Sequence, residues 1–179
     1  MCNSCFCKCS IFTENNFTLF QMNKFSKIAF CVFLCVAVGF LSSLVTRDSV
    51  LTWFPTQNKP FFNPPSWVFV PVWTLLYIGM GVAAGLVWNE ISTNAAIVKK
   101  ALIFFAIQLV LNAFWSYIFF GLHNPLLALV DIVLLWLFIF ETYKQFKNIN
   151  KLAGYLFIPY LAWVSFATLL NASIWWLNR

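Results

Sequence analysis

The side chains in this sequence that are best suited to chemistry are aromatic residues that carry a polar atom inside long apolar segments. Trp73 and Tyr77 lie one helical turn apart within the uncharged 22-residue run Trp67–Trp88. An indole N–H or a phenol O–H that is buried away from water needs a hydrogen-bond partner. The position of these two residues therefore predicts that the segment lines an internal pocket, where both rings can contact a ligand.

Polar residues recur on the faces of two further apolar segments. In residues 101–120, Gln108, Asn112 and Trp115 have the spacing i, i+4 and i+7, which places them on one helical face. A stripe of the last apolar segment consists of Trp163, Ala167, Leu170 and Ile174, with Asn171 beside it. Polar groups inside a membrane face other protein segments. Two interpretations stay open, namely hydrogen bonds between helices and a ligand pocket with aromatic walls and a few polar groups.

Acidic and basic catalysts are scarce in the apolar segments. Asp131 is the only acid well inside an apolar run, and it is either a hydrogen-bonding group between helices or a proton-relay carboxylate. The lack of a second buried acid and of an intramembrane histidine argues against the relay. His123 is the only histidine and is interpreted as a solvated turn residue. Because the sequence shows no Ser/His/Asp set, metal-ligand cluster or glycine-rich phosphate loop, it predicts no catalytic residue and no metal site, and leaves enzymatic activity open.

Composition decides the environment in which these residues act. The chain of 179 residues is 62% hydrophobic and only 9% charged, whereas soluble domains carry about 25% charged residues. An integral membrane protein with one domain is therefore predicted. The net charge is +6, but the basic residues lie at the ends of apolar runs, so the charge does not indicate binding to nucleic acid.

Five apolar segments are long enough to cross a bilayer. They cover Ile28–Val45, Trp67–Trp88, Ala101–Phe120, Pro125 to about Tyr143, and Leu152–Trp176. The predicted fold is therefore an all-α bundle of five transmembrane helices. The connection Thr46–Ser66 is rich in proline and aromatic residues, and we predict that it forms a stiff lid between the first two helices. Asn124 followed by Pro125 predicts the capped start of the fourth helix.

Lysine and arginine residues are distributed unequally between the two sides of this predicted bundle. One side holds eight, namely Lys8, Lys24, Lys27, Lys99, Lys100, Lys144, Lys147 and Lys151. The opposite side holds three, namely Arg47, Lys59 and Arg179. The positive-inside rule then predicts a cytoplasmic N-terminus and a proline-rich loop on the outer side.

Residues 1–21 form a polar tail without hydrophobic periodicity, and four of them are cysteines, namely Cys2, Cys5, Cys7 and Cys9. Such cysteines can bind a metal or carry palmitate, although their spacing matches no zinc module. We favour a disordered tail that the membrane domain, residues 22–179, does not require. Met22 is an alternative start.

Gly81 and Gly85 form a GxxxG pair in the second apolar segment. Small residues at this spacing let two helix backbones approach closely. The pair therefore predicts tight helix packing, and it is only weak support for a dimer.

Several motifs in a fixed order carry a resemblance to a known family. They are Trp53–Phe54, KPFFNPPSWVFVPVWTLLYIGMG from residue 59, QLVLN at 108–112, FFG at 119–121, ALVD at 128–131 and PYLAWVSFATLLN at 159–171. Over about residues 25–178 the chain closely resembles the translocator protein family, also called tryptophan-rich sensory proteins TspO or peripheral-type benzodiazepine receptors. The resemblance implies a five-helix bundle, often a homodimer, with a pocket for a hydrophobic small molecule beneath the first loop.

The pocket residues of the family can be carried over to the matching positions of this chain. They fall on Trp53, Trp73, Tyr77, Asn112, Trp115, Phe120, Trp163, Ala167 and Leu170, while Phe54 takes the place of a tyrosine that many members have. Leu127 stands where animal members have a pocket tryptophan. Ala172 and Ser173 replace the tyrosines of the animal cholesterol-recognition motif, which is weak even when intact. A tetrapyrrole such as protoporphyrin IX is therefore the expected ligand, and a sterol is not favoured.

The resemblance implies a membrane receptor or sensor for porphyrin-type ligands, with aromatic rings stacked on a flat macrocycle. The alternatives are a transporter of tetrapyrroles or sterols, a light-dependent porphyrin-degrading enzyme, and a structural subunit of a membrane complex. Five helices do not divide into the equal halves that many transporters show. The membrane is either a bacterial cell membrane or the outer membrane of mitochondria, and the sequence does not distinguish the two.

Overall fold

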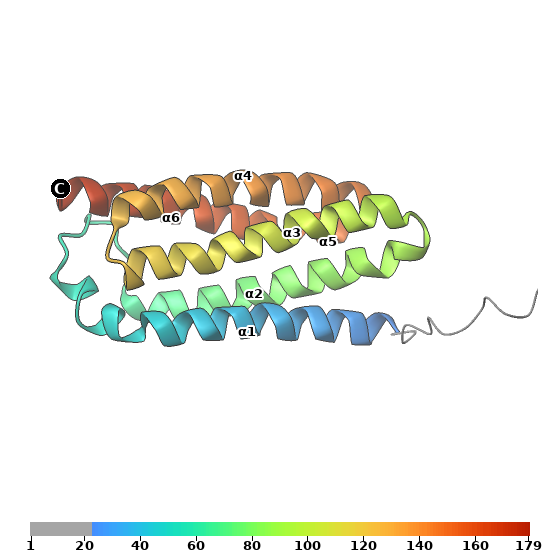
Figure 1. Ribbon diagram of the computed structural model, residues 1–179, viewed down its shortest axis with the longest axis horizontal. Coiled ribbons are helices and arrows are strands. Elements are labelled where there is room, and N and C mark those ends of the chain that lie inside the picture. Colours follow the sequence, from blue (N-terminus) through green and yellow to red (C-terminus); the bar gives the residue numbers. More distant parts are fainter. Residues whose placement is uncertain (1–22) are drawn as a thin grey trace, which may run out of the picture.

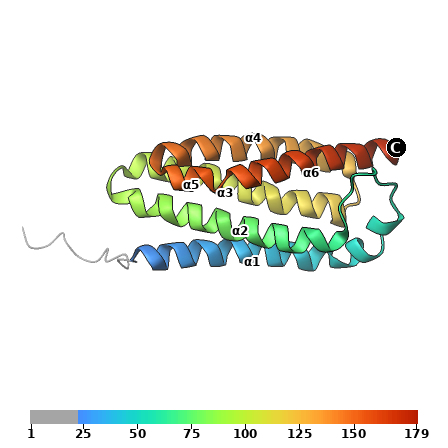
Figure 2. The same cartoon turned by 180° about the vertical axis from the view of Figure 1, so that it is seen from behind.

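The structure of the protein, a computed structural model, describes residues 23–179. Five stretches of helix are long and apolar enough to cross a membrane, which confirms the predicted fold class. They are α1 (Lys24–Leu51), α2 (Ser66–Asn89), α3 (Ala95–Ser116), α4 (Pro125–Ile149), and the consecutive helices α5 (Lys151–Tyr155) and α6 (Ile158–Leu177). Figures 1 and 2 show these spans side by side along the long axis of the molecule. The predicted tail, residues 1–21, lies outside the described residues.

The first helix is longer than its apolar run, because it continues from the predicted end at Val45 to Leu51. No glycine or proline interrupts residues 46–51, and the backbone N–H of Thr52 closes the last turn on the carbonyl of Asp48 at 2.9 Å. At the other end, the Asn23 side chain accepts a hydrogen bond from the backbone N–H of Ser26 at 2.8 Å. The helix therefore continues through the charged residues Arg47 and Asp48 and does not end at them.

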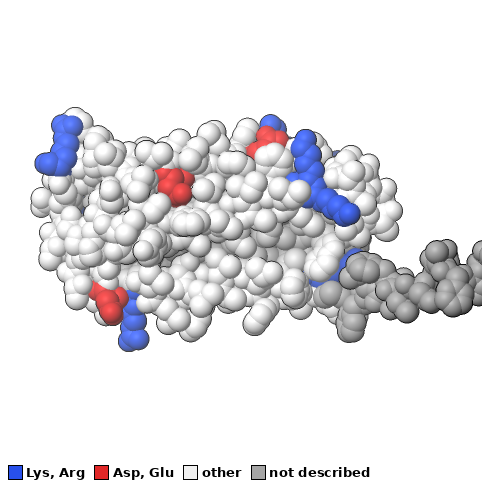
Figure 3. All heavy atoms as spheres, in the orientation of Figure 1, with Lys and Arg blue, Asp and Glu red and all other residues white. Residues whose placement is uncertain are grey.

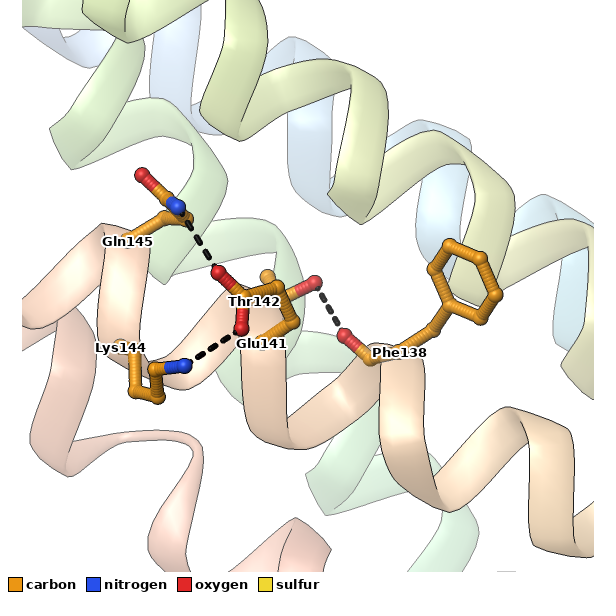
Figure 4. Close-up of polar contacts among 5 residues, drawn as sticks. All are labelled: Phe138, Glu141, Thr142, Lys144 and Gln145. Atoms are coloured by element: carbon orange, nitrogen blue, oxygen red, sulfur yellow. Dashed lines mark hydrogen bonds and ion pairs between the residues drawn. The ribbon is translucent and has the colours of Figure 1, made fainter.

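The fourth helix begins as predicted and ends later. The Asn124 side chain accepts a hydrogen bond from the backbone N–H of Leu127 at 3.0 Å, which is an N-cap. The helix passes the predicted end at Tyr143 and reaches Ile149. On this same helix, Glu141 accepts a hydrogen bond from Lys144 at 2.6 Å and another from Gln145 at 2.9 Å. Figure 4 shows both contacts. Contacts at i+3 and i+4 stabilise a helix after its apolar run has ended.

Two irregular helical segments lie within the membrane spans. The third span closes with η3 (Tyr117–Gly121), a π-helical turn. The fifth span is one membrane crossing, but it is divided between α5 and α6. Pro159 lies in the first turn of α6, and it has no N–H to donate to the carbonyl four residues earlier. The sequence predicted one continuous helix here, and the proline explains the break.

The connections also contain short helical turns. Residues 52–65 form the lid, the connection between α1 and α2, and contain η1 (Phe54–Thr56). The link between α2 and α3 contains η2 (Glu90–Ser92). In Figure 1 the lid lies at the same end of the bundle as the C-terminus.

The closest helix contact joins α1 and α2 through the predicted glycine pair. A methyl group at Gly81 would overlap the α-carbon of Val32, and one at Gly85 would lie 2.5 Å from the α-carbon of Ile28. Both glycines therefore allow the two backbones to touch, as predicted. Since α1 of the same chain covers the two glycines, the glycine pair is not available to a second copy of the protein. The homodimer stays a prediction, and its interface would lie elsewhere.

Candidate functional site

A cavity of about 710 Å³ lies at the lid end of the bundle. Its walls come from α1, α2, α3, η3 and α6, and Phe54 of the lid borders it from above. The volume falls within the range of roughly 300–1,000 Å³ that is typical of small-molecule pockets. Val70 lines the cavity and is 72% exposed. The cavity is therefore open to the surface.

Most of the residues predicted to bind a ligand meet in this cavity. The eight that line it are Phe54, Trp73, Tyr77, Trp115, Phe120, Trp163, Ala167 and Leu170. Trp73 is stacked against Trp115 with 6.4 Å between ring centroids, and Trp115 against Phe119 with 5.4 Å. The cavity thus has three consecutively stacked rings along one wall, with adjacent ring planes tilted by 29° and 26°. Contact of these residues with a ligand stays a prediction.

Asn112 does not line the cavity, although it was predicted to contact the ligand. It is 1% exposed. The Tyr77 hydroxyl donates to its Oδ1, and its Nδ2 donates to the Tyr160 hydroxyl at 3.0 Å. Asn112 therefore joins α2, α3 and α6 below the cavity. Of the two interpretations that the sequence left open, this is the hydrogen bond between helices.

Trp53 also lies outside the cavity wall. Its ring is stacked on His123 with 4.5 Å between centroids and meets Phe119 edge-on at 5.7 Å. His123 Nε2 lies 3.0 Å from the Ser49 hydroxyl, within hydrogen-bond distance. His123 is exposed in the turn, as interpreted from the sequence, and it also links the turn before α4 to the end of α1 and to the lid. Trp53, a lid residue, thus attaches the start of the lid to His123 and Phe119.

A pair of hydrogen bonds holds the other half of the lid. The backbone N–H of Asn58 donates to Oδ1 of Asn178 at 2.9 Å, and Nδ2 of Asn178 donates to the carbonyl of Asn58 at 2.9 Å. This reciprocal pair ties the middle of the lid to the end of α6. The position of the lid over the cavity is therefore fixed from both sides.

Some of the remaining intramembrane polar groups have a hydrogen-bond partner and others have none. The Tyr160 hydroxyl donates to Oε1 of Gln108 at 3.0 Å, which confirms Gln108 as a group between helices. Asn171 lines the cavity and accepts a hydrogen bond from Nε1 of Trp115 at 3.0 Å. Within residues 23–179, Nε1 of Trp163 and Oδ2 of Asp131 are buried without a partner. Asp131 does not line the cavity.

Sequence reasoning missed the wall that α1 contributes. Gly39, Ser43, Thr46, Arg47 and Val50 all line the cavity. Their spacing places them on one face of the helix. Small and polar residues on one face of an otherwise apolar helix were the available signal. The apolar run itself predicts only a membrane crossing.

The fold and the site define a class of protein: a multi-pass membrane protein with five spans and an aromatic cavity beneath a proline-rich lid. The sequence profile of the TspO/MBR family matches residues 31–177, and the chain belongs to this family. It is 47% identical over 162 residues to "Tryptophan-rich protein TspO" of Chlorobaculum tepidum, which covers 88% of this chain and 99% of the relative.

Animal and other bacterial relatives match over most of their length as well. The chain is 35% identical to "Translocator protein" of Bos taurus, over 79% of this chain and 83% of the relative. It is 38% identical to "Tryptophan-rich sensory protein" of Cereibacter sphaeroides, over 80% of this chain and 86% of the relative.

Proposed function

We propose that this protein is a membrane receptor or sensor that binds a flat, hydrophobic ligand of the tetrapyrrole type, such as protoporphyrin IX. The observation that carries the proposal is the aromatic cavity, in which Trp73 stacks on Trp115 and Trp115 stacks on Phe119. The relative named as a sensory protein supports a receptor role.

The energetics of the cavity favour such a ligand. Stacked aromatic pairs contribute about 0.5–1.5 kcal/mol each beyond the burial of apolar area. Three or four such pairs contribute up to about 6 kcal/mol, and burial of the apolar macrocycle adds to this, toward the roughly 8.2 kcal/mol that micromolar binding requires. Trp163 also lines the cavity and adds ring surface for such a ligand, whereas its Nε1 is buried without a partner and is not exposed to the cavity.

The proposal is tested by titrating the purified protein in nanodiscs with protoporphyrin IX and recording tryptophan fluorescence. We expect saturable quenching. Trp163→Phe removes part of the ring surface that lines the cavity, so Kd should rise about tenfold, which corresponds to about 1.4 kcal/mol. Trp176→Phe is the control, because Trp176 lies outside the cavity and is 57% exposed. Quenching that does not saturate in the wild-type protein would overturn the proposal.

The same samples separate binding from the two main alternatives. A light-dependent loss of porphyrin absorbance, absent in the dark, would assign the protein to the enzymes. Movement of porphyrin into protein-containing liposomes, faster than into empty ones, would assign it to the transporters. Saturable binding with neither change is the result expected for a receptor.

A further inference from the structure

We propose that Arg47 is the residue that recognises an anion at the cavity, and that it selects ligands with an ionised carboxylate at one edge of an apolar body. The inference rests on the proposed function, because it assigns a chemical class to the ligand of the same cavity. It concerns the polar part of the cavity wall, which the aromatic residues do not form.

Arg47 is the only charged residue among the described residues that line the cavity. Within residues 23–179 its guanidinium forms no ion pair and no hydrogen bond, although Asp48 is its neighbour in the chain. An arginine donates through a planar fork that matches a carboxylate, and such charge-assisted hydrogen bonds are stronger than neutral ones. Arg47 is exposed, so its unpaired fork is accessible to an anionic group of a ligand that enters the cavity.

The register of α1 against α2 places Arg47 beside the start of α2. Val32 packs against Gly81 in this antiparallel pair. Fifteen residues further along α1 is Arg47, and fifteen residues back along α2 is Ser66, which also lines the cavity. Ser66 is the first residue of α2, where the helix dipole is positive. The dipole and the guanidinium therefore favour the same sign of charge at this level of the cavity.

The same register separates the charged level of the cavity from the aromatic level. Trp73 lies seven residues further into α2 than Ser66, which is roughly 10 Å along a helix that rises 1.5 Å per residue. Arg47 lies in the last turns of α1, near the lid, whereas the stacked rings lie deeper. A ligand that fits this arrangement has a flat apolar body inside and its carboxylate at the level of Arg47.

The test compares protoporphyrin IX, which carries two carboxylates, with its dimethyl ester, which has the same macrocycle without charge. Affinities for both are measured by fluorescence quenching in nanodiscs of neutral lipid. We expect Arg47→Gln to weaken binding of the diacid about 10- to 100-fold and to leave binding of the diester unchanged. Arg47→Lys should retain part of the affinity for the diacid, because it keeps the charge and loses the fork.

Arg179→Gln is the matched control, since Arg179 carries the same charge at the same end of the bundle and lies over Trp176, outside the cavity. It should change neither affinity. Unchanged binding of the diester also shows that Arg47→Gln is folded. Equal effects of Arg47→Gln on both porphyrins, or no effect on the diacid, would overturn the inference alone. If neither porphyrin binds the wild-type protein saturably, the proposed function is overturned and this inference with it.

Discussion

The Tyr160 hydroxyl is the centre of the polar network beneath the cavity. It donates to Oε1 of Gln108 and accepts from Nδ2 of Asn112, each at 3.0 Å, and the residue is fully buried. Tyr160→Phe leaves both amide groups without this partner in a place that water does not reach. We expect the free energy of unfolding to fall by about 1–2 kcal/mol, measured by titration with SDS in mixed micelles.

Tyr143→Phe serves as the control for this change. The Tyr143 hydroxyl accepts a hydrogen bond from Lys147 on the exposed side of α4, so its loss should alter stability by less than about 0.5 kcal/mol. A Tyr160→Phe protein as stable as the control would show that the network does not stabilise the bundle. Because Tyr160 does not line the cavity, a large loss of ligand affinity at unchanged stability would also contradict this assignment.

The sequence could predict which residues share a helical face, but not what each one contacts. Gln108, Asn112 and Trp115 were placed on one face, and all three point toward other helices. Only Trp115 reaches the cavity, because the tyrosine hydroxyls of α2 and α6 cover Asn112. Whether a residue reaches the cavity depends on side chains from distant parts of the chain, so the periodicity of one helix does not predict it.

At the level of helices, the contact between α1 and α2 depends on the absence of a β-carbon at Gly81 and at Gly85. An alanine at Gly81 or Gly85 would place its β-carbon against the backbone of α1, which is unable to move aside as a side chain can. Gly81→Ala and Gly85→Ala should each destabilise the protein by about 1–3 kcal/mol, the range for overpacking. Unfolding in SDS, followed by circular dichroism, measures the change.

Gly79→Ala is a control in the same helix. The nearest atom to a β-carbon at Gly79 is the carbonyl oxygen of Leu156, at 4.0 Å, which is ordinary contact. Since alanine favours a helix over glycine by roughly 0.5–1 kcal/mol, this variant should be as stable as the wild type or more so. Equal losses at all three glycines would show that helix propensity, and not the approach of α1, governs the effect.

Hydrophobic runs predicted the number of spans and the middle of each helix, but not the ends. Helix ends are set by caps and breakers: Asn94 caps α3 by accepting from the backbone N–H of Ile97, so that Lys99 and Lys100 lie inside the helix. Hydropathy marks only where the lipid begins. The lid was predicted from its prolines, whereas its two attachments, at His123 and Asn178, join residues distant in sequence and had no signal in the pattern.

On the scale of the whole molecule, charge is confined largely to the two ends. Figure 3 shows lysine and arginine side chains near both ends of the long axis, with a middle that is nearly free of charge. The starts of α1, α3 and α5 and the end of α4 meet at one end. The cavity and the lid lie at the other. The helix order thus places the lysine-rich segments opposite the ligand site.

This separation predicts how the protein inserts when it is expressed in a bacterial inner membrane. Among the described residues, seven basic side chains belong to the end away from the lid, namely Lys24, Lys27, Lys99, Lys100, Lys144, Lys147 and Lys151, and positively charged segments stay in the cytoplasm. Alkaline phosphatase fused after Arg179 should therefore be active in the periplasm, while a fusion after Asn150 should be inactive. Green fluorescent protein at the same two positions is the control, and it should fluoresce only after Asn150. The reverse pattern would place the lid and the cavity mouth on the cytoplasmic side, so that ligand would reach Arg47 from within the cell.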